Sequence, residues 1–115
     1  MAALARLKRR QEFLRVAAGK RRYVAPGLIL QAAPHPTEPP EPARIGFTAS
    51  RKVGISVVRN RARRRLKAAV ATLMPLHAAP GVDYVLVARA ETARRPFADL
   101  LIDLETGLKR LGLWQ

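Results

Sequence analysis

The sequence contains no cysteine and is short of acidic and aromatic residues. Without cysteine, the chain has no disulfide framework, no thiolate nucleophile and no cysteine-ligated zinc site. No apolar run approaches the roughly 20 residues of a membrane-spanning helix. The basic N-terminus lacks the apolar core that would follow it in a signal peptide. We therefore expect a cytoplasmic protein with no membrane association.

The scarcity of carboxylates argues against catalysis by the chain itself. Its 115 residues include 8 Asp and Glu against 22 Lys and Arg, for a formal net charge of +14. A metal-dependent nuclease or phosphatase needs clustered carboxylates or a histidine pair, and the acids here are dispersed. No Gly-rich phosphate loop, HExxH or GxSxG motif is present. We predict no catalytic residue, no metal ligand and no cofactor bound by this chain.

The excess of positive charge predicts a polyanionic partner. A domain this basic repels itself unless it works beside a polyanion. The alternative is a basic face kept for solubility, but mixed charges would serve solubility without the self-repulsion. Because no helix-turn-helix pattern or dimer signal accompanies the arginines, RNA is favoured over DNA as the partner.

The periodicity of apolar residues predicts a single α+β domain over residues 1–115, with a modest aliphatic core. A proline-rich surface loop is expected over residues 34–43. The expected helices cover residues 6–18, 56–74 and 97–111, and the expected strands cover residues 28–33, 44–50 and 82–88. The central helix is expected to end at Met74-Pro75, and Phe97 opens the expected buried stripe of the last helix.

The most informative stretch is RIGFTASRKVGISVVRNRARRRLK, residues 44–67. It holds nine of the 22 basic residues and no acid. Ser56 is the expected N-cap of its helix, and arginines crowd the first third, where the macrodipole disfavours cations. The free amides of a first helical turn attract anions. The last helix instead has its acids early and its bases late, as the dipole prefers. We infer that phosphates dock on the first part of the central helix.

A second basic cluster surrounds the short helix in the first 25 residues. Phe13 lies on the apolar stripe of this helix and is either a core anchor or an aromatic platform for an unpaired base. In the strand that follows the proline-rich loop, Phe47 points to one face, and Thr48 and Ser50 point to the other. This polar face is either an ordinary solvated surface or room for a ligand to lie across the sheet.

Residues 44–67 resemble the signature of the protein subunit of bacterial ribonuclease P, which reads roughly R-[VI]-G-x-x-x-[SA]-[KR]-[KR]-x-G-x-[AS]-V-x-R-N-R-x-[KR]-R. The matching positions are Arg44, Ile45, Gly46, Ser50, Arg51, Lys52, Gly54, Arg59, Asn60, Arg61, Arg63 and Arg64. The segments EFLRV (12–16) and DYVLVAR (83–89) extend the resemblance over almost the whole chain. It implies an α-β-β-α-β-α order, a ribosomal-protein-like arrangement of helices on a mixed sheet, and a left-handed βαβ crossover.

The resemblance also implies a division of labour. The RNA subunit, which requires Mg²⁺, cuts precursor tRNA, and the protein binds both RNAs with no protein partner. The positions that match the groove for the 5′ leader of precursor tRNA are Phe13, Arg15, Thr48, Ser50, Arg51 and Lys52. The positions that match the contact with the RNA subunit are Arg59, Asn60, Arg61, Arg63, Arg64 and Lys67. Ala17 and Leu30 stand where some relatives carry aromatic residues. Phe13 is therefore expected to provide a larger share of the stacking on leader bases than it does in those relatives.

Two other classes of protein fit parts of the sequence. A small ribosomal or general RNA-binding protein would carry a similar charge, but it would not distinguish tRNA with a leader from tRNA without one. A basic membrane-surface protein would need large apolar residues on the helix face opposite the cations. In the central helix, two positions of that face are the small residues Ala62 and Ala69.

Overall fold

The computed structural model describes residues 4–35 and 42–115, and at their centre lies a five-stranded mixed sheet. Its strands are β1 (Ala5–Arg6), β2 (Arg22–Val24), β3 (Leu28–Pro34), β4 (Arg44–Thr48) and β5 (Val82–Ala88). Their order across the sheet is β1-β4-β5-β3-β2. β1, β4 and β5 are parallel, whereas β3 is antiparallel to β5 and β2. β5 is therefore the central strand, as its nearly continuous apolar sequence predicts.

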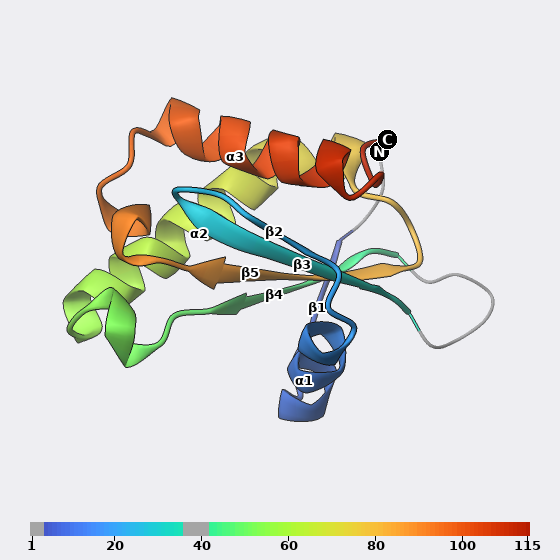
Figure 1. Cartoon of the computed structure of the whole chain (residues 1–115), viewed down its shortest axis with the longest axis horizontal. Helices are drawn as coiled ribbons and strands as arrows, with labels where there is room; N and C mark the ends of the chain where they lie inside the picture. The colour runs from blue at the N-terminus through green and yellow to red at the C-terminus, as the bar shows by residue number, and fades with distance from the viewer. Residues whose placement is uncertain (1–3, 36–41) are drawn as a thin grey trace.

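Three helices cover the two faces of this sheet. They are α1 (Arg10–Ala18), α2 (Ser56–His77) and α3 (Phe97–Arg110), joined by the short 3-10 helices η1 (Arg51–Val53) and η2 (Ala90–Ala93). Figure 1 shows α2 and α3 on one face and α1 on the other. Within the described residues, none of these helices is both long and apolar enough to cross a membrane.

The prediction of an α+β fold is confirmed. The sequence-based predictions were wrong for the two shortest strands and for the ends of some helices and strands. α1 begins at Arg10 rather than at residue 6, because residues 5 and 6 pair with β4 as strand β1. β1 and β2, of 2 and 3 residues, were missed since alternation cannot stand out in so short a segment. β4 ends at Thr48 instead of residue 50, where the chain turns into η1.

The proline-rich segment between β3 and β4 is described only in part. Pro34 is the last residue of β3 and not the first residue of a loop; it pairs with Val82 at the end of the ladder, where a proline is tolerated. Ala43 is buried, and its carbonyl accepts a hydrogen bond from the amide of Ala5 at 2.9 Å. Residues 36–41 of the predicted surface loop lie outside the described residues.

The two faces of the sheet support two separate cores. Tyr84 and Leu86 of β5 belong to the main core beneath α2 and α3, whereas Val85 belongs to the smaller core beneath α1. Successive strand residues point to opposite faces, so one strand serves both cores. Leu66 of α2 and Leu104 of α3 are both 0% exposed in the main core.

The ends of α2 differ from those expected. Ile55, whose backbone is extended (φ −67°, ψ 170°), is the N-cap, and Ser56 is the first helical residue. The Ser56 hydroxyl accepts a hydrogen bond from the Arg59 guanidinium (Nη2–Oγ, 2.9 Å) and does not cap the helix. At the other end, the helix continues through Pro75 to His77. A proline removes one intrahelical hydrogen bond, and this loss is tolerable so close to the C-terminus.

Phe97 is 37% exposed, although the periodicity of α3 places it on the buried stripe. The next residues of the stripe, Leu100 and Leu104, are fully buried as expected. Leu100 already lies at the start of β3, where a Cβ atom on Gly27 would be 2.6 Å from its Cδ2 atom. Phe97 lies one turn earlier, and it lines a surface pocket beside α2 instead of the core.

A network of ion pairs ties α1 to the sheet. Asp83 of β5 is 0% exposed and accepts two hydrogen bonds from Arg44 of β4, Nε–Oδ1 at 2.8 Å and Nη2–Oδ2 at 2.7 Å. Arg44 also pairs with Glu12 of α1 (Nη1–Oε2, 2.7 Å), and Arg15 of α1 pairs with Asp83. The hydrogen bonds that Arg44 donates to Asp83 raise the pKa of the Arg44 guanidinium, which stays charged.

Loss of the Glu12 charge should weaken this network in acid. The backbone amides of Arg9 and Lys8 (2.8 and 3.0 Å), and then the Arg44 charge, lower the pKa of Glu12 below its ordinary value of 4.5. Its contribution to stability is therefore present above the unfolded-state pKa and is lost as the pH falls through the folded-state pKa. Thermal unfolding of the wild type and of Glu12→Gln should differ near neutral pH, and the difference should shrink as the pH falls below 4.5 and through the lowered folded-state pKa. A constant difference down to lower pH would contradict this expectation.

Candidate RNA-binding surfaces

The first candidate surface lies where α1 crosses the sheet. The Phe13 ring packs directly on the backbone of β4, since a Cβ atom on Gly46 would lie 2.4 Å from the Phe13 Cε1 atom. Phe13 also packs against the small core of Leu7, Val16 and Val85, and the residue remains partly exposed. The ring is thus an anchor of α1 that keeps some accessible surface, and Gly46 is the residue that makes room for it.

Filling the space above Gly46 should displace this ring. A Cβ atom closer than 3.0 Å to a ring carbon cannot be accommodated without movement, so we expect Gly46→Ala to shift α1 away from the sheet. The cost should be about 1–3 kcal/mol of unfolding free energy, measured by urea denaturation. The double variant Gly46→Ala/Phe13→Leu should recover part of the loss. No recovery would mean that the clash lies elsewhere.

The other residues matched to the leader groove divide into two groups. Thr48 follows Gly46 on the same face of β4 and pairs with Val87, which packs beside Phe13 in the small core. Beyond the end of β4, the three remaining positions, Ser50, Arg51 and Lys52, are exposed in and before η1. Along the chain, these residues define a path from β4, on which the ring of Phe13 packs, through η1 to the start of α2.

Arg15 does not join that path. Its guanidinium donates to the carbonyl of Pro34 (Nη1–O, 2.8 Å) and pairs with the buried carboxylate of Asp83. Asp83 is level with Arg44 in the sheet, whereas Thr48 lies four residues further along β4, about 13 Å away at ~3.3 Å per residue. Arg15 therefore holds α1 to the sheet, and its guanidinium lies apart from the positions at and beyond the end of β4.

The second candidate surface is the first half of α2. It carries all six positions matched to the RNA subunit, namely Arg59, Asn60, Arg61, Arg63, Arg64 and Lys67. Among the residues that the structure describes, no ion pair involves an arginine or lysine of α2, and the first turn has no acid. The helix therefore presents a set of cations that the described part of the chain leaves without counter-charges.

The six side chains point to different sides of α2. Arg61 and Arg64 line a pocket toward α3, while Asn60, Arg63, Arg64 and Lys67 line another of about 510 Å³. The Arg63 guanidinium donates to the Asn60 side-chain carbonyl (Nη1–Oδ1, 2.8 Å), which orders that pair. Arg59 is partly buried, and its Nε atom has no hydrogen-bond partner among the described residues.

A further cation, Arg6 of β1, extends this surface toward the sheet edge. Lys67 of α2 and Arg6 of β1 lie 6.0 and 5.6 Å from the centre of the Phe47 ring, within the range of cation–π contacts. Ile45 and Phe47 of β4 both contact the main core, and Phe47 is the one that stays partly exposed, so its ring lies where the core meets the basic surface.

Arg65 has a structural role that sequence reasoning did not find. Its guanidinium donates to the carbonyl of Thr92 (Nη1–O, 2.6 Å) and to that of Arg95. It thereby fixes η2 and the start of α3 to α2. Its partners lie 27 and 30 residues further along the chain, and no local pattern indicates such a contact.

The described residues contain no group of three or more His, Asp or Glu side chains that could hold a metal ion. A family model for ribonuclease P matches residues 1–112. The chain belongs to the ribonuclease P protein family. The resemblance inferred from the RIG and RNR segments is thus confirmed, and the family match includes both candidate surfaces.

Individual relatives of the ribonuclease P family agree with this assignment. A ribonuclease P protein component of Paramagnetospirillum magneticum is 56% identical over 99% of this chain and 87% of its own length. One from Gluconacetobacter diazotrophicus is 48% identical over 94% of this chain and 91% of its own.

Solved structures of ribonuclease P proteins share the fold. The protein from Staphylococcus aureus superposes with a TM-score of 0.76 at 19% identity, over 96% of this chain and 97% of its own. The protein from Thermotoga maritima superposes with a TM-score of 0.71 at 21% identity, over 92% and 94% of the two chains. At these identities the likeness supports the fold alone.

Proposed function

We propose that this chain is the protein subunit of ribonuclease P, which binds the RNA subunit and the 5′ leader of precursor tRNA. In this role it assists the endonucleolytic removal of the leader, which generates the mature 5′ end of tRNA. The observation that carries the proposal is the set of cations on the first half of α2, with no counter-charge in the described chain, in a member of this family.

The α2 surface is the contact with the RNA subunit. Arg59, Arg61, Arg63, Arg64 and Lys67 supply cations, and Asn60 supplies a hydrogen-bonding amide. Guanidinium groups donate fork-shaped pairs of hydrogen bonds that match phosphate oxygens. Neutralising phosphates releases condensed counterions, so this contact should weaken steeply as salt rises.

The α1 surface holds the 5′ leader. Phe13 offers a partly exposed ring, Thr48 and Ser50 offer hydroxyl groups, and Arg51 and Lys52 offer charge at the end of β4. Unstacked bases bind to aromatic rings, and their phosphates bind to cations, without need for a particular sequence. Arg15 contributes by positioning α1, since its charge is paired with Asp83.

Catalysis belongs to the RNA subunit in this proposal. The chain contributes no catalytic residue and holds no metal; Mg²⁺ acts through the RNA. The enzyme works in the cytoplasm, without a membrane and without a protein partner. The protein increases the fraction of precursor tRNA that is bound to the enzyme in a position that the RNA subunit can cleave.

The deciding experiment is cleavage of a precursor tRNA by a bacterial ribonuclease P RNA at low magnesium, with and without the protein. Rescue of cleavage at the 5′ end by one equivalent of protein is the expected result. Tight RNA binding that ignores the leader and gives no rescue would favour a ribosomal-type RNA-binding protein. Cleavage by the protein with no RNA subunit present would overturn the proposed division of labour.

Phe13→Ala should discriminate between substrates. Loss of base stacking is expected to weaken binding of leader-bearing tRNA to the holoenzyme by about 1–3 kcal/mol, roughly 5- to 150-fold, and to leave mature tRNA unaffected. The matched control is Leu14→Ala, which truncates a neighbouring side chain that is 54% exposed. Equal weakening for both tRNAs would assign Phe13 to the core alone.

A further inference from the structure

The arginines of α2 border a groove as well as an open helix face. Two adjoining pockets lie between α2 and the segment that leads from β5 into α3, and both include Arg61. The first, of about 460 Å³, is lined by Val53, Val58, Arg61, Ala90, Ala93 and Arg94. The second, of about 320 Å³, is lined by Arg61, Arg64, Arg65, Ala68 and Phe97. We refer to the two pockets together as the α2–η2 groove.

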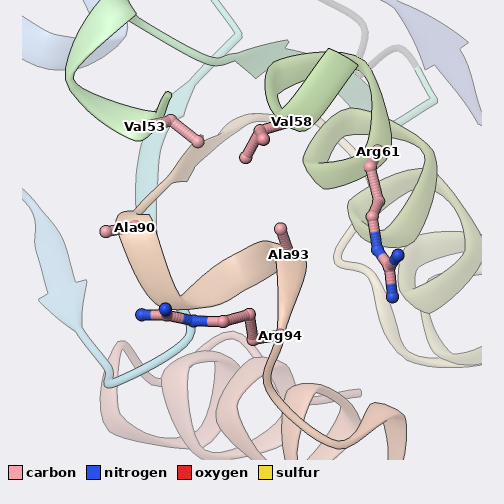
Figure 2. A pocket seen from close by; sticks show the side chains of 6 residues that line it. All are labelled: Val53, Val58, Arg61, Ala90, Ala93 and Arg94. Atoms are coloured by element: carbon pink, nitrogen blue, oxygen red, sulfur yellow. The ribbon is translucent and has the colours of Figure 1, made fainter. Parts of the chain in front are cut away.

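The first pocket has an apolar floor and a basic rim. Figure 2 shows the side chains of Val53, Val58 and Ala93 directed toward its interior, with Arg61 at the edge formed by α2 and Arg94 at the edge formed by η2. Its volume lies within the roughly 300–1,000 Å³ that is usual for small-ligand sites. A ligand that complements this pocket therefore has an apolar body and negative charge at its edge.

The second pocket adds an aromatic surface. Phe97 is 37% exposed, and it lines this pocket together with Arg61 and Arg64. No acidic residue lines either pocket. Arg94 does pair with Glu91 at 2.5 Å, but both side chains are more than half exposed, and such a pair is weak and easily exchanged for a phosphate.

The walls of the groove are held in place without a ligand. Arg65 donates to the carbonyls of Thr92 and Arg95, which fixes η2 to α2. The Thr92 hydroxyl donates to the carbonyl of Gly27 at 2.6 Å and accepts from the amide of Arg89 at 2.8 Å, which fixes η2 to the sheet. A site already ordered in this way binds its ligand without the cost of arranging its walls.

We propose that the α2–η2 groove binds unpaired nucleotides of the RNA subunit. One base lies on the apolar floor of the first pocket, and a neighbouring base stacks on Phe97. Arg61, Arg64 and Arg94 hold the phosphates between them. This inference rests on the proposed function and adds a base-binding site to a contact otherwise made through phosphates. Paired bases are stacked inside their helix and cannot enter a pocket, so the groove selects single-stranded or bulged nucleotides.

The central test uses two substitutions of one side chain. Phe97→Leu retains an exposed apolar residue of similar size but removes the aromatic face, and Phe97→Trp restores that face. In titrations with a full-length bacterial ribonuclease P RNA transcript, Phe97→Leu should weaken binding about 5- to 150-fold, and Phe97→Trp should stay within about threefold of the wild type. Equal affinity of Phe97→Leu and the wild type would overturn the stacking site.

A second pair of variants tests the first pocket. Ala90→Glu places a carboxylate at its exposed rim, and Thr72→Glu places the same charge on an exposed position of α2 that lines neither pocket. Only Ala90→Glu should weaken RNA binding strongly. An equal effect of the two variants would mean that the added negative charge repels RNA in general and that the pocket itself binds no nucleotide. Both residues are exposed, and thermal unfolding verifies that each variant folds.

Chemical probing separates this inference from the proposed function. Dimethyl sulfate should show an unpaired adenine or cytosine that the wild type protects and Phe97→Leu leaves reactive. If the wild type does not bind the transcript, the proposed function itself is wrong. If the wild type binds, and Phe97→Leu gives the same affinity and the same protections, only the base-binding role of the groove is wrong.

Discussion

Replacing Asp83 with alanine is expected to lower the free energy of unfolding by about 3–5 kcal/mol, which is the usual cost of removing one partner from a buried ion pair. The Asp83 side chain is 0% exposed and accepts hydrogen bonds from Arg44 and Arg15. Without it, two guanidinium groups that are only 20% and 35% exposed lose their main counter-charge. Because small domains have about 5–15 kcal/mol of stability in total, the variant should approach the unfolding threshold.

Thermal unfolding measures this effect directly. A loss of this size corresponds to a fall of roughly 10–20 °C in Tm for a chain of this length. The matched control is Glu105→Gln, which removes the carboxylate from the exposed pair with Lys109 and should cost about 0.5 kcal/mol or less. If the two variants unfolded at similar temperatures, the buried network would contribute no more than a surface pair.

Arg61→Ala/Arg64→Ala is expected to cause the largest loss of affinity for the RNA subunit. Both side chains are exposed on α2 and have no ion pair within the described residues. A hydrogen bond to a charged group contributes roughly 1.5–3 kcal/mol, so each arginine that contacts a phosphate should account for at least about tenfold in affinity. The plot of log K against log salt should also flatten, by about 0.7–0.9 per lost contact and by about 1.4–1.8 in total.

The control for this prediction is Lys109→Ala/Arg110→Ala, which removes two cations from the last turn of α3. It changes the net charge of the protein by the same amount, so any difference between the two double variants reports local contacts. The salt slope of this control should remain close to that of the wild type. An unchanged slope in Arg61→Ala/Arg64→Ala would mean that these side chains are only solvated.

The sequence alone was sufficient for the elements with strong patterns. β5 was predicted with its observed bounds because a run of apolar residues is characteristic of a strand covered on both faces. The stripe of α2 and the basic face opposite it follow from a period of 3.6 residues. Phosphate binding by the first part of α2 stays a prediction, made because its arginines oppose the helix dipole whereas the charges of α3 follow it.

The tertiary structure decided which of the charged and aromatic residues are free to bind. Periodicity assigns a side chain to a face of its own helix or strand, but it does not say what packs against that face. Arg15 is paired with Asp83, 68 residues away, and is not free, whereas Phe97 is 37% exposed and lines a surface pocket. The same packing requires Gly46 under the ring of Phe13. Such contacts join distant parts of the chain, so only the assembled sheet and helices determine them.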